Sequence, residues 1–307
     1  MADVKILDGG LSSELDAGGF LIKGDPLWSA RVLQTNPPAI KDVHLRFLKS
    51  GADVITTATY QASVVGFQKY LGLCVEDATE LLRSGVKIAK EAADEFSSKT
   101  SDMKRPLIAG SVGPYGAFLH DCSEYSGSYV DEMSVEELTA WHRPQLQCLE
   151  SAGVDLFALE TIPSQKEAEA FVALLREFPN TKAWLSYSCK DELHTYHGEK
   201  FTDAINVAIK TTQLVAVGVN CSPPTIISPL LTSANKNNFD VQMIVYPNKG
   251  GVWDPNVGWS KTIYEKTLAS YAEEWVDLGA KWIGGCCQTT PSDIAGLQQV
   301  LRSSQVK

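Results

Sequence analysis

Short apolar runs recur along the chain, and each one ends at a small, polar or charged residue. Eight runs have the length and the β-branched content of buried strands. They are Lys5–Leu7, Asp53–Thr57, Leu107–Ala109, Leu156–Leu159, Ala183–Ser188, Val215–Val219, Gln242–Tyr246 and Trp282–Ile283. The segments between and after them have the apolar spacing of helices that bury one face. These segments are Pro38–Lys49, Val75–Phe96, Val135–Ala152, Gln165–Phe178, Asp203–Thr211, Ile226–Ala234, Thr262–Leu278 and Pro291–Leu301.

The alternation of eight strands with eight helices predicts a (β/α)8 TIM barrel, an α/β fold with a parallel sheet. No low-complexity linker interrupts the pattern, so we expect a single domain over residues 1–307. A doubly wound open sheet is the alternative. The first strand, however, is not followed by the Gly-x-Gly-x-x-Gly sequence of a dinucleotide-binding sheet.

Three predicted connections are longer than a plain barrel needs. They span residues 8–28, 110–130 and 247–260, after the first, third and seventh strands. All three follow the carboxyl ends of strands, where barrel enzymes place their active sites. Their richness in Gly, Trp and Tyr predicts pocket walls or lids.

Composition and charge narrow the class of protein. The 307 residues are 44% hydrophobic and 21% charged, which is typical of a globular protein with a sizeable core. The net charge of −10, without any Lys/Arg-rich run, argues against a nucleic-acid or membrane partner. No apolar run approaches the roughly 18 residues of a membrane helix. Because no signal peptide precedes the first strand, we expect a cytoplasmic protein.

Three of the seven cysteines stand at predicted strand ends. Cys221 closes one apolar run, and Cys286 and Cys287 follow Gly284-Gly285 at the end of another. On the rim of a barrel these thiols would meet, and three thiolates on Zn²⁺ leave one position open, as in a catalytic zinc site. The alternative is that they are small buried residues.

These cysteine motifs, with others in the same order, resemble the zinc-dependent homocysteine S-methyltransferases over essentially the whole chain. The motifs are Leu7-Asp8-Gly9-Gly10, Leu27-Trp28-Ser29-Ala30, Thr59-Tyr60-Gln61-Ala62-Ser63, Gly110-Ser111-Val112-Gly113-Pro114-Tyr115-Gly116-Ala117, Ser123-Glu124-Tyr125, Glu160-Thr161-Ile162-Pro163, Gly218-Val219-Asn220-Cys221, Tyr246-Pro247-Asn248 and Gly284-Gly285-Cys286-Cys287 with Thr289-Thr290-Pro291. The resemblance implies zinc-dependent transfer of a methyl group from a sulfonium donor, S-methylmethionine or S-adenosylmethionine, to the thiolate of L-homocysteine, giving L-methionine. It also implies that Cys221, Cys286 and Cys287 bind the zinc ion.

The resemblance assigns roles to further residues. It implies that Asp8 and Glu160 hold the amino group of the amino-acid substrate; a helix cap and an ion pair are their structural alternatives. Gly9 would let the backbone approach the ligand closely. Three aromatic residues are candidates for a donor pocket, where ring faces hold a sulfonium, although they are as often mere packing. They are Trp28, Tyr60 and Tyr246.

The chain looks most like the short, sulfonium-using branch, because Thr161 stands where the betaine-using branch has Tyr and no long dimerisation extension follows the last helix. A monomer is expected for the same reason. Two departures from the family pattern leave the donor preference open: Lys249-Gly250-Gly251 replaces Ser-Gly-Glu, and Gln288 replaces a common Arg. The alternatives are a selenocysteine methyltransferase, a betaine-dependent homocysteine methyltransferase, and a non-catalytic zinc or thiol-amino-acid binding protein.

Overall fold

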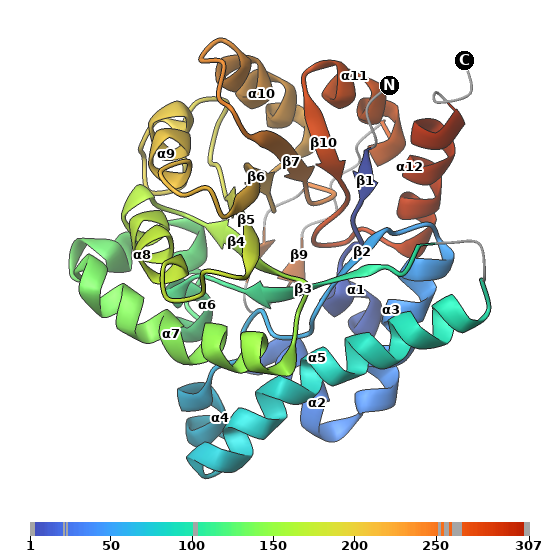
Figure 1. Cartoon of the computed structure of the whole chain (residues 1–307), viewed down its shortest axis with the longest axis vertical. Helices are drawn as coiled ribbons and strands as arrows, with labels where there is room; N and C mark the ends of the chain where they lie inside the picture. Colours follow the sequence, from blue (N-terminus) through green and yellow to red (C-terminus); the bar gives the residue numbers. More distant parts are fainter. Residues whose placement is uncertain are drawn as a thin grey trace.

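The chain folds into a (β/α)8 barrel (Figure 1). The computed structural model describes residues 4–20, 22, 24–100, 104–250, 253–254, 258–259 and 266–303. Eight strands form one sheet in the order β1-β10-β7-β6-β5-β4-β3-β2, and every neighbouring pair is parallel. A bridge between Leu7 and Val54 joins the two ends of this order and closes the ring. The strands are β1 (Lys5–Ile6), β2 (Val54–Thr56), β3 (Leu107–Val112), β4 (Leu156–Ile162), β5 (Lys182–Tyr187), β6 (Leu214–Asn220), β7 (Gln242–Tyr246) and β10 (Ala280–Ile283).

The helices surround the sheet (Figure 1). The α-helices are α1 (Leu11–Ala17), α2 (Val32–Thr35), α3 (Pro37–Lys49), α4 (Val64–Leu71), α5 (Val75–Ser98), α6 (Tyr115–Leu119), α7 (Val135–Ala152), α8 (Gln165–Leu175), α9 (Phe201–Ala208), α10 (Ile227–Asn235), α11 (Ala272–Asp277) and α12 (Pro291–Ser303). Short 3-10 turns are η1 (Trp28–Arg31), η2 (Ser123–Tyr125), η3 (Ser128–Asp131), η4 (Pro224–Ile226) and η5 (Leu268–Tyr271), and a small hairpin is formed by β8 (Trp253–Asp254) and β9 (Gly258–Trp259).

The predicted barrel is confirmed, and the doubly wound alternative is wrong. Each predicted strand corresponds to one strand of the sheet, although β3 and β4 run on to Val112 and Ile162. The predicted helix at Thr262–Leu278 is replaced, where the structure describes it, by η5 followed by α11; residues 262–265 lie outside the described residues. The first long connection contains α1, and the second contains α6, η2 and η3.

The barrel interior is a packed core filled with side chains. Trp184 lies at its centre: its ring centroid is 5.9 Å from that of Trp282 and 6.2 Å from that of Tyr246. Around them pack buried residues from the other strands, Leu7, Val54, Ala109, Leu156, Ala158, Ala216 and Ile244. This layer forms the floor on which the functional site is built.

A buried carboxylate fixes the long segment that follows β3. Glu167, fully buried on α8, accepts hydrogen bonds from the backbone N–H of Tyr115 (2.7 Å), the hydroxyl of Tyr129 (2.5 Å) and Nε2 of His142 on α7 (2.8 Å). Since Tyr115 and Tyr129 lie on either side of η2, Glu167 ties both ends of that turn to the helical layer. η2 is thereby held over the barrel mouth.

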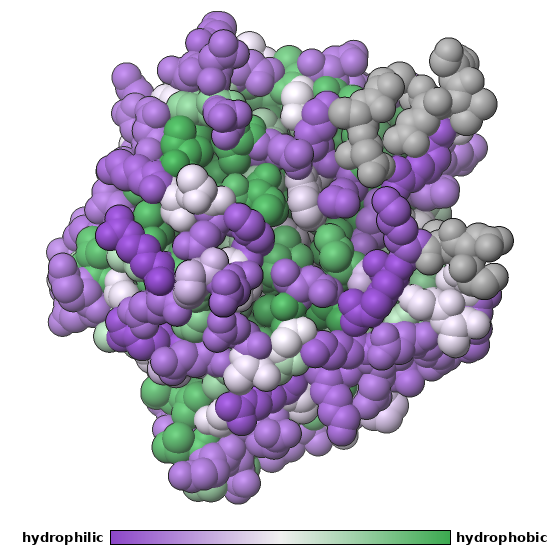
Figure 2. Space-filling view, in the orientation of Figure 1, coloured by the Kyte–Doolittle hydropathy of each residue, from purple (hydrophilic) through white to green (hydrophobic). Residues whose placement is uncertain are grey.

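The outer surface is mostly polar. Figure 2 shows hydrophilic residues over much of the face drawn, with apolar residues gathered towards its centre. Among the helices in the described ranges, none combines the length and the apolarity that crossing a membrane requires.

Candidate active site at the mouth of the barrel

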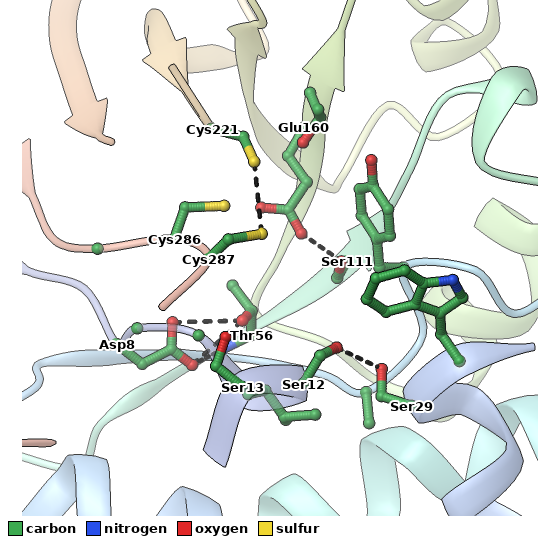
Figure 3. Close-up of a pocket in the computed structure, with 18 of the residues that line it drawn as sticks. Asp8, Ser12, Ser13, Ser29, Thr56, Ser111, Glu160, Cys221, Cys286 and Cys287 are labelled. Carbon is green, nitrogen blue, oxygen red and sulfur yellow. Dashed lines mark hydrogen bonds between the residues drawn. The ribbon is translucent and has the colours of Figure 1, made fainter. Parts of the chain in front are cut away.

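A cavity lies over the carboxyl ends of the strands (Figure 3). Seven strands supply residues to its wall or floor: Asp8 after β1, Thr56 of β2, Ser111 of β3, Glu160 of β4, Cys221 after β6, Tyr246 of β7, and Cys286 and Cys287 after β10. η1 contributes Trp28, and η2 contributes Glu124 and Tyr125. The site therefore draws on almost every βα connection of the fold.

Three cysteine thiols converge in this cavity. The Sγ atoms of Cys221, Cys286 and Cys287 all lie within 4.8 Å of one another, and those of Cys221 and Cys287 are 3.5 Å apart. Hydrogen bonds from the Cys286 and Cys287 thiols lower the pKa of the Cys221 thiol well below its usual range. The hydroxyl of Tyr125 also lies 3.3 Å from the Cys221 sulfur. The structure thus brings the three predicted metal ligands together.

The backbone around these thiols explains their convergence. Cys221 has a left-handed φ of 47°, which turns its side chain off the line of β6, and its N–H donates to the Tyr246 carbonyl. Gly285 permits the return of the chain after β10, because a Cβ there would lie 2.2 Å from Oγ1 of Thr289. The Cys286 N–H then donates to the Pro247 carbonyl at 2.8 Å.

The geometry of the cluster fits a zinc ion. Sulfurs placed about 2.3 Å from a tetrahedral zinc are about 3.8 Å from one another, close to the separations seen here. An all-thiolate set is also the soft donor set that zinc accepts. With three protein sulfurs, the fourth position would face the cavity.

Two buried carboxyl groups face the same space. Asp8 accepts hydrogen bonds from the backbone N–H of Thr56 (2.8 Å) and from its hydroxyl, while Glu160 accepts one from the hydroxyl of Ser111. Burial raises the pKa of Asp8 to about 8 and that of Glu160 to about 7. The charge of Glu160 adds to the shift of the Asp8 pKa. A cationic partner would therefore stabilise the ionised form of each carboxyl group.

Glu160 owes its direction to a bulge. The pairing of β4 with β5 shifts register between Leu159 and Ile162, and Thr161 has a left-handed φ of 63°. Asn220 holds this conformation, because its Oδ1 accepts from the Thr161 N–H (2.7 Å) and its Nδ2 donates to the Thr161 hydroxyl (2.8 Å). A bulge at a barrel rim re-aims a side chain. Here it directs Glu160 into the cavity, beside Cys221 in Figure 3.

The predicted aromatic residues lie at different depths. Trp28 and Tyr60 are half-buried in the cavity wall, and Trp28 has an unusual φ of 47°. Tyr246 lies lower, where its hydroxyl accepts a hydrogen bond from Nε1 of Trp184 (2.9 Å) and bonds to Ser186. Gly9 also lines the cavity, but a Cβ there would approach Thr289 within 2.7 Å, so packing alone requires glycine.

The two departures from the family pattern contact each other. Nε2 of Gln288 donates to the Gly250 carbonyl at 2.9 Å, and Nζ of Lys249 pairs with the Asp293 carboxylate at 2.7 Å. The N–H of Lys249 also donates to the Cys287 carbonyl. These contacts link the segment that follows β7 to the turn at Cys287 and Gln288, which follows β10. Gly251 and most of the predicted loop to Ser260 lie outside the described residues.

The cavity lining also includes residues to which the sequence analysis assigned no role. Thr56 and Ser111 stand at strand ends and bond the two carboxyl groups, a position that strand prediction alone could have indicated. Glu124 and Gln61 had no such signal, because they lie outside the strands. The described lining contains the carboxylates of Asp8, Asp16, Glu124 and Glu160 and three thiols, without any Lys, Arg or His.

Comparison with known proteins identifies the family. A sequence model described as homocysteine S-methyltransferase matches residues 5–301. The chain belongs to the homocysteine S-methyltransferase family. This confirms the predicted resemblance. The relatives in this methyltransferase family are named for different substrates. The chain is 41% identical to a betaine-homocysteine S-methyltransferase of Drosophila melanogaster, covering 97% of this chain and 94% of the relative.

Other members of the family are equally similar. Homocysteine S-methyltransferase 1 of Zea mays is 42% identical (97% of this chain, 94% of the relative), and a selenocysteine Se-methyltransferase of Brassica oleracea is 41% identical (97% and 89%). The metallated crystal structure of the Escherichia coli homocysteine methyltransferase MmuM superposes with a TM-score of 0.87 at 38% identity, over 97% of this chain and 96% of that one. The apo form of MmuM gives 0.77. The oxidized form gives 0.86, so the chain superposes about equally well on the metallated and oxidized forms.

Proposed function

We propose that this homocysteine S-methyltransferase family member transfers a methyl group from a sulfonium donor, with S-methylmethionine as the preferred donor, to the sulfur of L-homocysteine in a zinc-dependent reaction. The convergence of three thiols beside two buried carboxyl groups in one cavity carries this proposal. The thiols supply a soft metal site, and the carboxyl groups supply partners for an amino-acid ammonium group.

Cys221, Cys286 and Cys287 would hold the metal at the side of the cavity formed by β6 and β10. When bound, zinc supplies a position at which the homocysteine thiol is held as a thiolate at neutral pH. Asp8 and Glu160 bind the α-ammonium of homocysteine, and that cation favours their ionised form. The protein therefore orients the acceptor from two ends, by its sulfur and by its ammonium group.

The transfer itself needs no general base. One C–S bond of the sulfonium breaks as the bond from the methyl carbon to the homocysteine sulfur forms, and the donor sulfur keeps the electron pair. Because opposite charges disappear in this step, a cavity that excludes water assists it. Trp28 and Tyr60 contribute ring faces that attract the sulfonium by roughly 0.5–2 kcal/mol. The acidic lining adds a long-range attraction for any cationic donor.

A donor and acceptor survey tests this proposal. The zinc-loaded protein is incubated with L-homocysteine and, separately, S-methylmethionine, S-adenosylmethionine and betaine, and methionine is quantified. We expect methionine from the sulfonium donors. Turnover with betaine alone would assign the betaine branch, and preference for selenocysteine as acceptor would assign the selenium reaction.

A cysteine variant tests the metal. We expect about one zinc per chain in the wild type. Cys287→Ser should lose both zinc and turnover, whereas Cys74→Ser should keep both, because Cys74 is exposed at the start of α5. Zinc bound without methyl transfer from any donor would identify a binding protein and contradict the proposal.

A further inference from the structure

Two polar atoms of the cavity residues have no partner. Oε2 of Glu124 and Oε1 of Gln61 are buried, and neither has a hydrogen-bond partner in the described part of the chain. Both side chains line the cavity that holds the cysteine cluster. A buried acceptor without a donor is costly, most of all when it belongs to a carboxyl group. A site with two such acceptors is completed by a ligand that donates hydrogen bonds.

Glu124 differs in this respect from the other two carboxyl groups near the cysteines. Asp8 and Glu160 are each bonded by a neighbouring side chain, whereas Oε2 of Glu124 is not. No Lys, Arg or His among the described lining residues can neutralise Glu124. Within the described part of the chain nothing completes this contact, and a ligand cation with N–H groups would satisfy both the charge and the unpaired oxygens.

The position of Glu124 is suited to the methyl donor. It lies on η2, between Cys122 and Gly127, whose left-handed φ values are 66° and 70°. Tyr125, the next residue, contacts the Cys221 sulfur at 3.3 Å, so η2 reaches the metal side of the cavity. The Glu124 charge also contributes to the raised pKa of Tyr60 in the aromatic wall. Glu124 thus lines the same cavity as the thiol cluster and the Tyr60 ring that would hold the sulfonium.

We propose that Glu124, assisted by Gln61, binds the α-ammonium group of the methyl donor and thereby selects sulfonium amino acids over donors that lack N–H groups. The inference deepens the proposed function and depends on it. S-methylmethionine carries an ammonium group with three N–H donors on its α-carbon, and two methylene groups join that carbon to the sulfonium sulfur. The nitrogen of betaine carries three methyl groups and no N–H, so betaine would leave both acceptors unpaired. A site built to pair with a ligand N–H rejects an analogue without it.

The matched pair of donors for the test is S-methylmethionine and 3-dimethylsulfoniopropionate, which keeps the dimethylsulfonium and the carboxylate but lacks the ammonium group. We expect wild-type kcat/KM to be roughly 30-fold higher for S-methylmethionine, because a charged hydrogen bond is lost with the analogue. In Glu124→Gln the ratio should fall below about 3-fold, through a higher KM for S-methylmethionine. The KM for homocysteine should stay unchanged.

Controls separate a local effect from a general one. Glu132→Gln removes a charge from the same connection between β3 and α7, but Glu132 is exposed and lies outside the cavity lining, so the donor ratio should keep its wild-type value. Gln61→Leu should reduce the ratio by a smaller factor. Zinc content and homocysteine KM report that each variant is folded.

Each outcome decides a different point. A wild type that uses S-methylmethionine, with a donor ratio that Glu124→Gln does not change, overturns the assignment of Glu124 and leaves the proposed function intact. A wild type that uses S-methylmethionine and 3-dimethylsulfoniopropionate equally also overturns the assignment of Glu124 and leaves the proposed function intact. A wild type that transfers methyl groups from no sulfonium donor overturns the proposed function, and the role of Glu124 with it.

Discussion

Asp8→Asn should stabilise the metal-free protein while it weakens homocysteine binding. Asp8 is only 3% exposed, and burial raises its pKa from the ordinary value of 3.8 to about 8. At pH 7 its carboxyl group is therefore protonated in the empty folded protein and ionised in the unfolded chain. Since the folded state binds this proton more tightly, the contribution of Asp8 to stability falls as the pH rises from about 4 to about 8.

The size of the effect follows from the shift. Each pKa unit corresponds to about 1.4 kcal/mol, so the raised pKa of Asp8 lowers the free energy of unfolding by at most about 4 kcal/mol at pH 7. Asparagine cannot ionise, has nearly the same shape, and can still accept the hydrogen bond from the Thr56 N–H. Asp8→Asn should raise the melting temperature at pH 7 by up to roughly 6 °C. The difference should be small near pH 4, where the aspartate is protonated in the folded state and only about half ionised in the unfolded chain.

Homocysteine affinity should change in the opposite direction. Loss of one charged hydrogen bond to the ammonium group costs about 1.5–3 kcal/mol, or roughly 10- to 150-fold in Kd. Calorimetric melting from pH 4 to pH 8 and titration with homocysteine measure the two effects. Asp42→Asn, an exposed carboxylate on α3, is the control. A melting temperature below that of the wild type at pH 8, with the same dependence on pH, would refute the argument from burial.

Two further substitutions test how the fold positions the site, with Gly296→Ala as the control for the first. Gly218→Ala places a Cβ 1.8 Å from the Ile244 carbonyl oxygen, so β6 and β7 must separate; we expect a loss above about 3 kcal/mol by urea unfolding. Gly296→Ala on α12 meets only an ordinary contact at 3.4 Å with Ala269 and should be neutral or stabilising by up to about 1 kcal/mol. Glu167→Gln leaves one of its donors without an acceptor and should cost about 3 kcal/mol. Faster hydrogen exchange in residues 113–131 would report the release of η2, and unchanged exchange would contradict the anchoring role.

The sequence predicted the barrel because its strands are buried on both faces. Continuous apolar runs such as Leu156–Leu159 and Val215–Val219 have no polar alternation that could be mistaken for a half-exposed sheet. The same patterns placed Cys221 and Cys286 at strand ends, and parallel strands bring such ends to one rim. The sequence pattern could therefore predict the cluster, even though Cys221 and Cys287, whose sulfurs are 3.5 Å apart, are 66 residues apart in sequence.

Other parts of the site depend on contacts that no local pattern encodes. The bulge at Thr161 is fixed by Asn220, which lies 59 residues away, and strand periodicity gave no sign of it. How deep a side chain lies inside the barrel also depends on contacts between residues that are distant in sequence. Tyr246, predicted as a candidate for the donor pocket, lines the cavity, and its hydroxyl also accepts a hydrogen bond from Trp184 on the floor. The unpaired acceptor of Glu124 could be recognised only once burial and neighbours were known.

The acidic lining of the cavity also bears on what happens after the chemistry. In the proposed reaction, S-methylmethionine enters with a net charge of +1 and homocysteine reacts as a thiolate, whereas both products are methionine molecules without net charge. A wall of carboxylates and thiols that lacks cationic side chains among its described residues attracts the donor but gains little from the product. Transfer of the methyl group thus removes the net charge that attracted the donor, while the contacts to the ammonium groups remain. Methionine should therefore bind more weakly than S-methylmethionine, as product-inhibition kinetics would show.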